Sequence, residues 1–189
     1  MKMKNIAIFA SGEGTNAQQL IDYFKDNKTI KVALVVSNKS IANVLNRAKV
    51  SGIPSLIINK KDFYDNNNII EKLLDYNIDI IILAGFLWMI PESLIKAFPD
   101  KIINIHPALL PKFGGKGMYG MNVHKAVIES KESESGISIH YVNEKYDEGK
   151  IIAHYKCTVS ENETPESLAK KIHLLEHENY PKVIEQLIS

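Results

Sequence analysis

The sequence predicts an α/β fold: a doubly wound, mainly parallel sheet with helices on both faces and an antiparallel strand pair near the C-terminus. Two observations support this fold class. In the first half of the chain, short apolar segments rich in β-branched residues alternate with longer amphipathic segments. Such alternation is typical of right-handed βαβ units and therefore of a parallel sheet. After residue 107 the pattern changes to two neighbouring strand-like segments and one long helix-like segment.

The predicted elements of the first half follow from this alternation. Strands are expected at residues 5–10, 31–37, 55–58, 78–84 and 101–105, and helices between them at 16–26, 41–51, 62–76 and 91–98. The fourth strand reads IDIIILAG from Ile78 to Gly85, without a sustained alternation of apolar and polar residues. A strand that is buried on both faces has this composition, so the segment is expected near the centre of the sheet.

The second half of the chain begins with a glycine-rich loop at 113–120, which is followed by a short helix. Two strands are then expected at 136–143 and 150–159. Asp147-Glu148-Gly149 lies between them and is a typical turn sequence, so the two strands are expected to pair antiparallel.

The last helix is expected to begin at Thr164, which is a good N-cap residue, with Pro165 in its first turn. It should continue for about two dozen residues, the length of the amphipathic segment that remains. Neither repeats nor low-complexity linkers interrupt the chain. We therefore expect a single domain over residues 1–189.

The composition restricts the classes of function. The formal net charge is only +1, which argues against nucleic acid and acidic membranes as partners. Cys157 is the only cysteine, so an internal disulfide is excluded and a buried apolar thiol is expected. The apolar run from Ile6 to Ala10 is too short for the core of a signal peptide, and no segment approaches the length of a membrane span. A cytoplasmic protein is expected.

The segment from Ser11 to Asn16, which reads SGEGTN, follows the first predicted strand and precedes a helix. Glycine allows the backbone to approach an anion closely, and the start of a helix offers free N–H groups. The first βα turn of a doubly wound sheet also lies at the edge where ligands bind. We therefore interpret Gly14, Thr15 and Asn16 as a phosphate loop. The alternative is an ordinary glycine turn capped by Thr15 or Asn16.

A second polar motif ends the fifth predicted strand, where Asn104 and His106 are followed by Pro107. Side chains alternate along a strand, so Asn104 and His106 share one face. A histidine alone at a strand end is more often structural. An amide beside an imidazole at a ligand-binding edge can polarise a carbonyl oxygen and transfer a proton, which is the chemistry of acyl transfer.

Five segments together resemble the phosphoribosylglycinamide formyltransferases of the folate-dependent formyltransferase superfamily. They occur in the order found in that family and cover nearly the whole chain. They are SGEGTN at 11–16, LAGF at 83–86, NIHPALLPKF at 104–113, SGISIHYV through YDEG at 135–149, and EHENYP at 176–181.

The resemblance implies the formyltransferase fold and a reaction between two small molecules. The amine of glycinamide ribonucleotide would attack the formyl carbon of 10-formyltetrahydrofolate, in the synthesis of purines. Asn104, His106 and Asp147 would be the catalytic residues: Asn104 and protonated His106 would stabilise the oxyanion, while Asp147 would lie beside the imidazole and raise its pKa. Taken alone, Asp147 reads as a turn residue.

The resemblance also implies which residues bind the two substrates. Gly14, Thr15, Asn16 and Glu176 would bind glycinamide ribonucleotide, and His140 would lie close to the site. The folate pocket would be formed by Leu87, Trp88, Met89, Ile90, Asn104, Asn143, Glu144, Lys145, Tyr146 and Asp147. No metal is expected, and His124, His154, His173 and His177 are interpreted as structural. A homodimer is compatible with the resemblance, but the sequence does not decide the oligomeric state.

Two departures from the family pattern concern folate. Trp88 stands where many members have an arginine. The stretch 60–66 lacks an arginine that contacts folate in some members, and Lys60 or Lys61 could replace it. These changes affect the expected folate affinity rather than the chemistry.

Three other functions are weighed against this one. Methionyl-tRNA formyltransferase would need a further tRNA-binding domain and a basic surface, and formyltetrahydrofolate deformylase a regulatory domain before the catalytic one. A non-catalytic sugar-phosphate-binding module has no evident need for all three of Asn104, His106 and Asp147.

The segment from Gly114 to Gly120 is longer than the corresponding connection common in the family. Its four glycines, among seven residues, give the backbone high conformational freedom. One hypothesis is a mobile cover over the folate pocket, with Met118 and Tyr119 as its apolar surface. The alternative is an ordered surface loop or a subunit contact.

Overall fold

The computed structural model describes residues 3–65 and 68–188 and has a mixed sheet of seven strands at its centre. The strands are β1 (Lys4–Phe9), β2 (Ile30–Ser37), β3 (Ser55–Ile57), β4 (Ile80–Leu83), β5 (Ile102–His106), β6 (Glu134–Tyr141) and β7 (Ile151–Thr158). Their spatial order is β3-β2-β1-β4-β5-β6-β7. The first five strands pair parallel, and β5–β6 and β6–β7 pair antiparallel, which confirms the predicted fold class.

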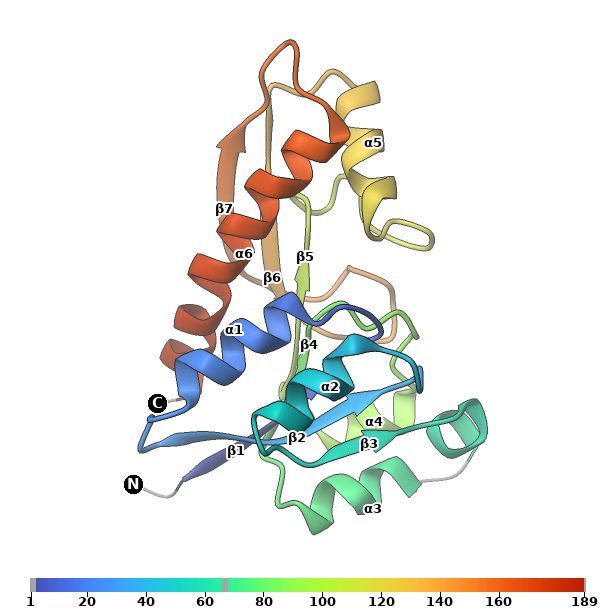
Figure 1. Ribbon diagram of the computed structural model, residues 1–189. Helices are drawn as coiled ribbons and strands as arrows, with labels where there is room; N and C mark the ends of the chain where they lie inside the picture. The colour runs from blue at the N-terminus through green and yellow to red at the C-terminus, as the bar shows by residue number, and fades with distance from the viewer. Residues whose placement is uncertain (1–2, 66–67, 189) are drawn as a thin grey trace.

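Helices cover both faces of the sheet (Figure 1). They are α1 (Thr15–Phe24), α2 (Asn43–Val50), α3 (Asn68–Asp75), α4 (Glu92–Ala97), α5 (Met121–Glu129) and α6 (Pro165–Ile188). Helices α1, α2 and α6 contribute to one apolar cluster, and α3 and α4 to the other. None of the helices in the described parts of the chain is long and apolar enough to cross a membrane.

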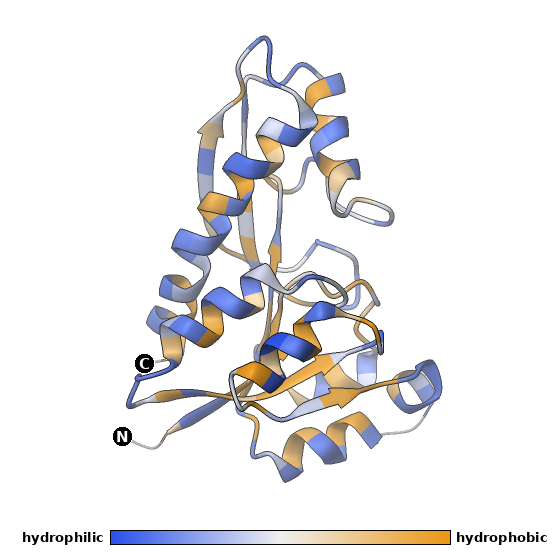
Figure 2. Ribbon diagram, viewed as in Figure 1, coloured by the Kyte–Doolittle hydropathy of each residue, from blue (hydrophilic) through white to orange (hydrophobic). Residues whose placement is uncertain are grey.

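The alternation of side chains along the strands explains the two clusters. In β1, Ile6 and Ile8 belong to the α1–α6 side, whereas Ala7 and Phe9 belong to the α3–α4 side, and all four are fully buried. A strand between two helical layers has no polar face, which is why β1 and β4 read as continuous apolar runs. Figure 2 shows this contrast between the apolar strands and the amphipathic helices.

The segment predicted as one helix over 62–76 is the clearest difference. Residues Lys61–Asp65 form a single π-helical turn, and α3 occupies Asn68–Asp75. Asn59 explains the separate turn, because its side chain accepts a hydrogen bond from the Asp62 N–H at 2.9 Å and donates one to the Asp62 carboxylate at 2.6 Å. Local side-chain bonds of this kind compete with regular helix formation.

The predicted start of the last helix is confirmed. The Thr164 hydroxyl accepts a hydrogen bond from the Ser167 N–H at 3.2 Å, as an N-cap side chain does. The helix then runs for 24 residues. It places Glu176 next to the start of α1 and Tyr180 beneath the sheet, where the Tyr180 hydroxyl donates to the Leu83 carbonyl at 3.0 Å.

The topology brings the loops that carry the polar motifs to one edge of the sheet. The order of the strands reverses between β1 and β4, and ligands of doubly wound folds bind at such a reversal, beyond the carboxyl ends of the strands. The loops after β1, β4 and β5 and the β6–β7 connection all reach this region, at the middle right of Figure 1.

Candidate active site

Four of the predicted or suspected site residues meet at the carboxyl end of β5. Asn104 and His106 lie on the same face of that strand, and His140 is the partner of Asn104 on β6. The Asn104 side-chain amide lies 3.0 Å from Nε2 of His140. Asp147, from the β6–β7 connection, reaches both imidazoles: its carboxylate is 3.6 Å from Nδ1 of His106 and 3.7 Å from Nε2 of His140.

The hydrogen bonds of the two histidines define which ring nitrogens carry protons. His106 Nε2 lies 2.8 Å from the Phe113 carbonyl, which can only accept, so Nε2 is the donor. His140 Nδ1 likewise donates to the Tyr141 carbonyl at 2.8 Å. In the neutral rings, His106 therefore presents an unprotonated Nδ1 toward Asp147. His140 Nε2 accepts from Asn104, which leaves the second amide hydrogen of Asn104 for a ligand.

The charge state of His106 differs from the prediction. Burial lowers the pKa of His106, and the nearby Asp147 carboxylate and the Phe113 carbonyl raise it by less. Asp147 raises this pKa, as expected, but desolvation of a ring that is 3% exposed outweighs the carboxylate, so the pKa of His106 lies below its usual range. The neutral imidazole is the resting form near neutral pH.

Asp147 stays ionised. Burial raises the pKa of the Asp147 carboxyl, but the His140 imidazole, the charge of His106 and the Gly115 N–H together lower it below its usual range. The Gly115 N–H donates to Asp147 at 2.9 Å. Asp147 itself adopts a φ of 55°, in the left-handed region that aspartate tolerates better than most residues. A buried carboxylate is thus positioned to stabilise positive charge on His106.

The predicted phosphate loop lies beside this group. Gly14 has a φ of 70°, and its backbone is followed directly by α1. The Asn16 side chain donates to the Glu176 carboxylate at 2.9 Å, which links the loop to α6. Glu176 is 5% exposed, and burial raises its pKa to about 7, although the bond from Asn16 opposes the shift. Only the family resemblance predicted a role for Glu176 in binding the substrate.

The closeness of Gly14 to α2 gives glycine a role that the sequence did not show. A Cβ atom at Gly14 would lie 2.6 Å from Cβ of Val44. Glycine is required here by packing against α2 as well as by its positive φ. Thr15 is exposed at the start of α1.

Tyr64 bonds to one of the two segments predicted to form the folate pocket, and sequence reasoning missed it. Its hydroxyl donates to the Met89 carbonyl at 3.0 Å. Burial and the neighbouring Tyr146 raise the pKa of Tyr64. Tyr64 is therefore held against the segment Leu87–Ile90. The only signal was its place in the stretch 60–66, whose last residue, Asn66, lies outside the described residues.

The individual residues of these segments have different environments. Leu87, Met89 and Tyr146 are exposed, whereas Trp88 is half-buried and Ile90 is buried. Asn143 donates to the Glu148 carbonyl at 3.2 Å, and Lys145 forms an exposed ion pair with Glu148. Glu144 is exposed. These polar residues shape the connection but do not contact the Asn104–His106–Asp147 group.

A pocket of about 500 Å³ lies next to Asp147. Leu110, Gly114, Tyr146 and Gly149 contribute to its wall. Within the described residues, no group of three or more His, Cys, Asp or Glu side chains could hold a metal ion. The arrangement offers amide, imidazole and carboxylate groups at the edge of an open pocket, which suits proton transfer and stabilisation of an oxyanion.

Comparison with known proteins matches residues 4–184 to the formyl transferase family. The chain belongs to this family. It is 39% identical to phosphoribosylglycinamide formyltransferase of Bacillus subtilis, over 98% of this chain and 95% of that protein. It is 42% identical to the chloroplastic phosphoribosylglycinamide formyltransferase of Arabidopsis thaliana, over 97% of this chain.

The chain spans 65% of the Arabidopsis protein and 62% of the chloroplastic relative from Vigna unguiculata. Among solved structures, glycinamide ribonucleotide transformylase 1 of Geobacillus kaustophilus superposes with a TM-score of 0.90 at 37% identity, covering 99% of this chain and 100% of the other. The formyltransferase fold predicted from the motifs is thereby confirmed.

Glu176 gives a prediction for stability. Because its pKa rises from 4.5 to about 7 on folding, the free energy of unfolding should fall as pH increases through that window. Glu176→Gln removes the titration. We expect urea unfolding to give similar stabilities for both proteins near pH 4.5, and a variant more stable by up to about 3 kcal/mol above pH 7. A difference that does not change with pH would show that Glu176 is not protonated in the free protein.

A mobile cover can involve only part of the segment from Gly114 to Gly120. Phe113 and Gly115 are anchored by His106 and Asp147, so mobility is predicted only for residues 116–120, where Tyr119 is 54% exposed. Amide hydrogen exchange at 116–120 should be fast in the free protein and slow down with a folate analogue plus glycinamide ribonucleotide. Gly115 serves as the internal control, with slow exchange in both states. Protection at 116–120 that is already high without ligands would make this an ordered loop.

Proposed function

We propose that this protein transfers the formyl group of 10-formyltetrahydrofolate to the amine of glycinamide ribonucleotide, in purine synthesis. The observation that carries the proposal is the cluster at the same sheet edge as the glycine loop, in which Asn104 bonds to His140 and Asp147 lies beside His106 and His140. The relatives named as phosphoribosylglycinamide formyltransferases support the choice of substrates.

The folate supplies an electrophilic formyl carbon, and the residues of this chain supply the proton transfers and the charge stabilisation. The amine attacks that carbon, and the free amide hydrogen of Asn104 donates to the formyl oxygen as it becomes negative. The proton lost by the amine goes to Nδ1 of His106. Asp147 stabilises the resulting imidazolium, whose proton then passes to the folate nitrogen as the bond to the formyl carbon breaks.

The lowered pKa of His106 suits this order of events. A neutral ring can accept a proton from the amine, and it becomes cationic only when the formyl oxygen becomes negative. Burial raises the free energy of each charge on its own. It also strengthens the attraction between the imidazolium and the oxyanion. The site therefore favours the charged imidazole in the reacting complex more than in the free protein.

The acceptor is proposed to lie between the glycine loop and α6. The loop binds the phosphate, while Glu176 and Asn16 face the sugar. The buried Oδ1 of Asn16 has no hydrogen-bond partner among the described residues. The exposed apolar side chains of Leu87, Met89 and Tyr146 are proposed to contact the folate.

The direct test is formyl transfer from 10-formyltetrahydrofolate to glycinamide ribonucleotide, with water and methionyl-tRNA as competing acceptors. Transfer to the ribonucleotide alone is expected. Release of formate without an amine acceptor would indicate a deformylase, and formylation of methionyl-tRNA a tRNA formyltransferase. Tight binding of both ligands without any transfer would indicate a non-catalytic binding module.

His106→Ala should lower kcat by at least about 100-fold, because it removes the proton acceptor, and leave both KM values little changed.

In the wild type, kcat/KM should fall as pH decreases through the lowered pKa of His106, since the protonated ring cannot accept a proton. Asp147→Asn removes a group that raises this pKa, so the acid limb should move to lower pH while kcat falls. His154→Ala, on β7, is the control. Near-normal turnover of both site variants would remove these residues from the mechanism.

A further inference from the structure

Helix α2 contacts the glycine loop through three donors. The Val44 N–H donates to the Gly12 carbonyl at 3.2 Å, and Nε of Arg47 donates to the Glu13 carbonyl at 2.7 Å. The Asn43 side chain donates to the Glu13 carboxylate at 3.1 Å. Arg47 is the only arginine of the chain.

These bonds determine where the neighbouring N–H groups point. In a planar trans peptide, the C=O and the N–H point in opposite directions. The carbonyls of Gly12 and Glu13 both point toward α2, so the N–H groups of Glu13 and Gly14 both point away from it. Two successive N–H groups on the same side form a concave anion-binding site. The left-handed conformation of Gly14 is the backbone geometry of such a site.

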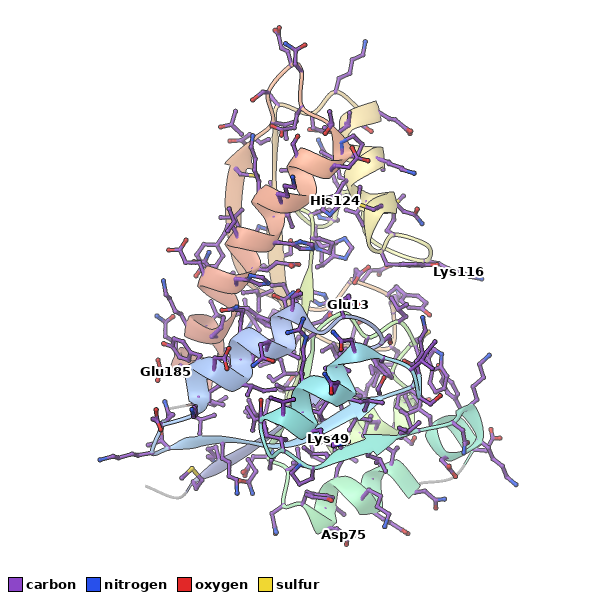
Figure 3. All side chains as sticks on the ribbon, viewed as in Figure 1. Glu13, Lys49, Asp75, Lys116, His124 and Glu185 are labelled. Carbon is purple, nitrogen blue, oxygen red and sulfur yellow. The ribbon has the colours of Figure 1, made fainter. Side chains whose placement is uncertain are left out.

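The N–H groups face the side of the loop where the acceptor is proposed to bind. Helix α1 lies between α2 and α6 in Figure 1, and the Asn16–Glu176 hydrogen bond joins the loop to α6. The N–H groups of Glu13 and Gly14 therefore face the side of the loop opposite α2. Figure 3 shows Glu13 on this loop and Lys49 further along α2. Asn43 also holds the Glu13 carboxylate on the α2 side, where it repels an incoming phosphate least.

We propose that Arg47 is a positioning residue for the phosphate of the acceptor. Its Nε–H holds the Glu13 carbonyl against α2, so that the N–H groups of Glu13 and Gly14 face the phosphate. The guanidinium acts on the loop and not on the ligand. The inference rests on the proposed function, because it assumes a phosphorylated acceptor.

Two substitutions separate the hydrogen bond from the positive charge. Arg47→Met keeps a chain of similar length but has no donor and no charge. Arg47→Gln is also uncharged, yet its amide nitrogen stands at the position along the side chain that Nε occupies in arginine. Lys49→Met removes one charge from the same helix without touching the loop. Each variant is assayed with glycinamide ribonucleotide and with glycinamide riboside, which lacks the phosphate.

Arg47→Met should raise KM for the ribonucleotide by about tenfold, the order expected for loss of a hydrogen bond from a charged group. KM for the riboside and kcat at saturation should stay unchanged. Arg47→Gln should restore most of the ribonucleotide KM, and Lys49→Met should resemble the wild type. Independently of catalysis, inorganic phosphate should shift the amide resonances of Glu13 and Gly14 in the wild type and much less in Arg47→Met.

Three results would overturn the inference. Equal increases in KM for both acceptors would indicate a general structural role, and an Arg47→Gln protein as weak as Arg47→Met would indicate a direct effect of charge. An unchanged ribonucleotide KM in Arg47→Met would show that the loop keeps its shape without this bond. A wild type that transfers no formyl group to either acceptor would instead refute the proposed function, and the phosphate titration would still test Arg47.

Discussion

The arrangement of the site depends on one buried carboxylate. Asp147 contacts His106 from β5, His140 from β6 and the Gly115 N–H from the loop after β5. The Asp147 carboxylate is a contact that these three segments share. Its negative charge raises the pKa of His106 against the larger effect of burial, and its Oδ2 accepts a hydrogen bond from the Gly115 N–H at the start of the loop. Loss of this charge would therefore affect geometry and proton affinity together.

The packing around Asp147 shows how little freedom this part of the loop has. A Cβ at Gly114 would lie 2.5 Å from Cδ2 of Leu110 and 3.2 Å from Cβ of Asp147. Gly115 has a φ of 96°, a conformation that other residues rarely adopt. These two glycines serve close approach and a tight turn rather than mobility. Glycine content alone could not distinguish these uses, because the same residue type serves both.

The sequence predicted the sheet and its helices because each element carries a local signal. The continuous apolar run of β4 and the N-cap at Thr164 depend on interactions within a few residues, and both were confirmed. The juxtaposition of Asn104 with His106 also follows from the two-residue repeat of a strand. What the sequence could not give is contact across large separations, such as Tyr64 with Met89 and Arg47 with Glu13. The lowered pKa of His106 could not be predicted from the sequence either, since burial is a property of the whole fold.

The aromatic residues around Trp88 suggest how this chain accommodates the absence of arginines near the proposed folate segments. The Trp88 ring lies 5.6 Å from the ring of Phe63 and 6.0 Å from that of Tyr64, measured between centroids. Phe86 contacts both Phe63 and Trp88. These contacts place the Trp88 ring within an aromatic cluster, so it does not simply occupy the space of a flexible cationic side chain.

This difference changes the physical basis of donor binding under the proposed function. A cation attracts the carboxylates of a folate through a charge interaction that salt screens. An aromatic and apolar surface would contact the rings of the folate instead, and burial of apolar area depends little on ionic strength. Tyr64 belongs to this surface, because it bonds to Met89 and packs against Trp88. Asp147 lines the same pocket as Tyr146, whereas His106 and Asp147 are held by contacts of their own with the Phe113 carbonyl and the Gly115 N–H. The aromatic part of the donor site can therefore vary in composition while the reacting groups stay in place.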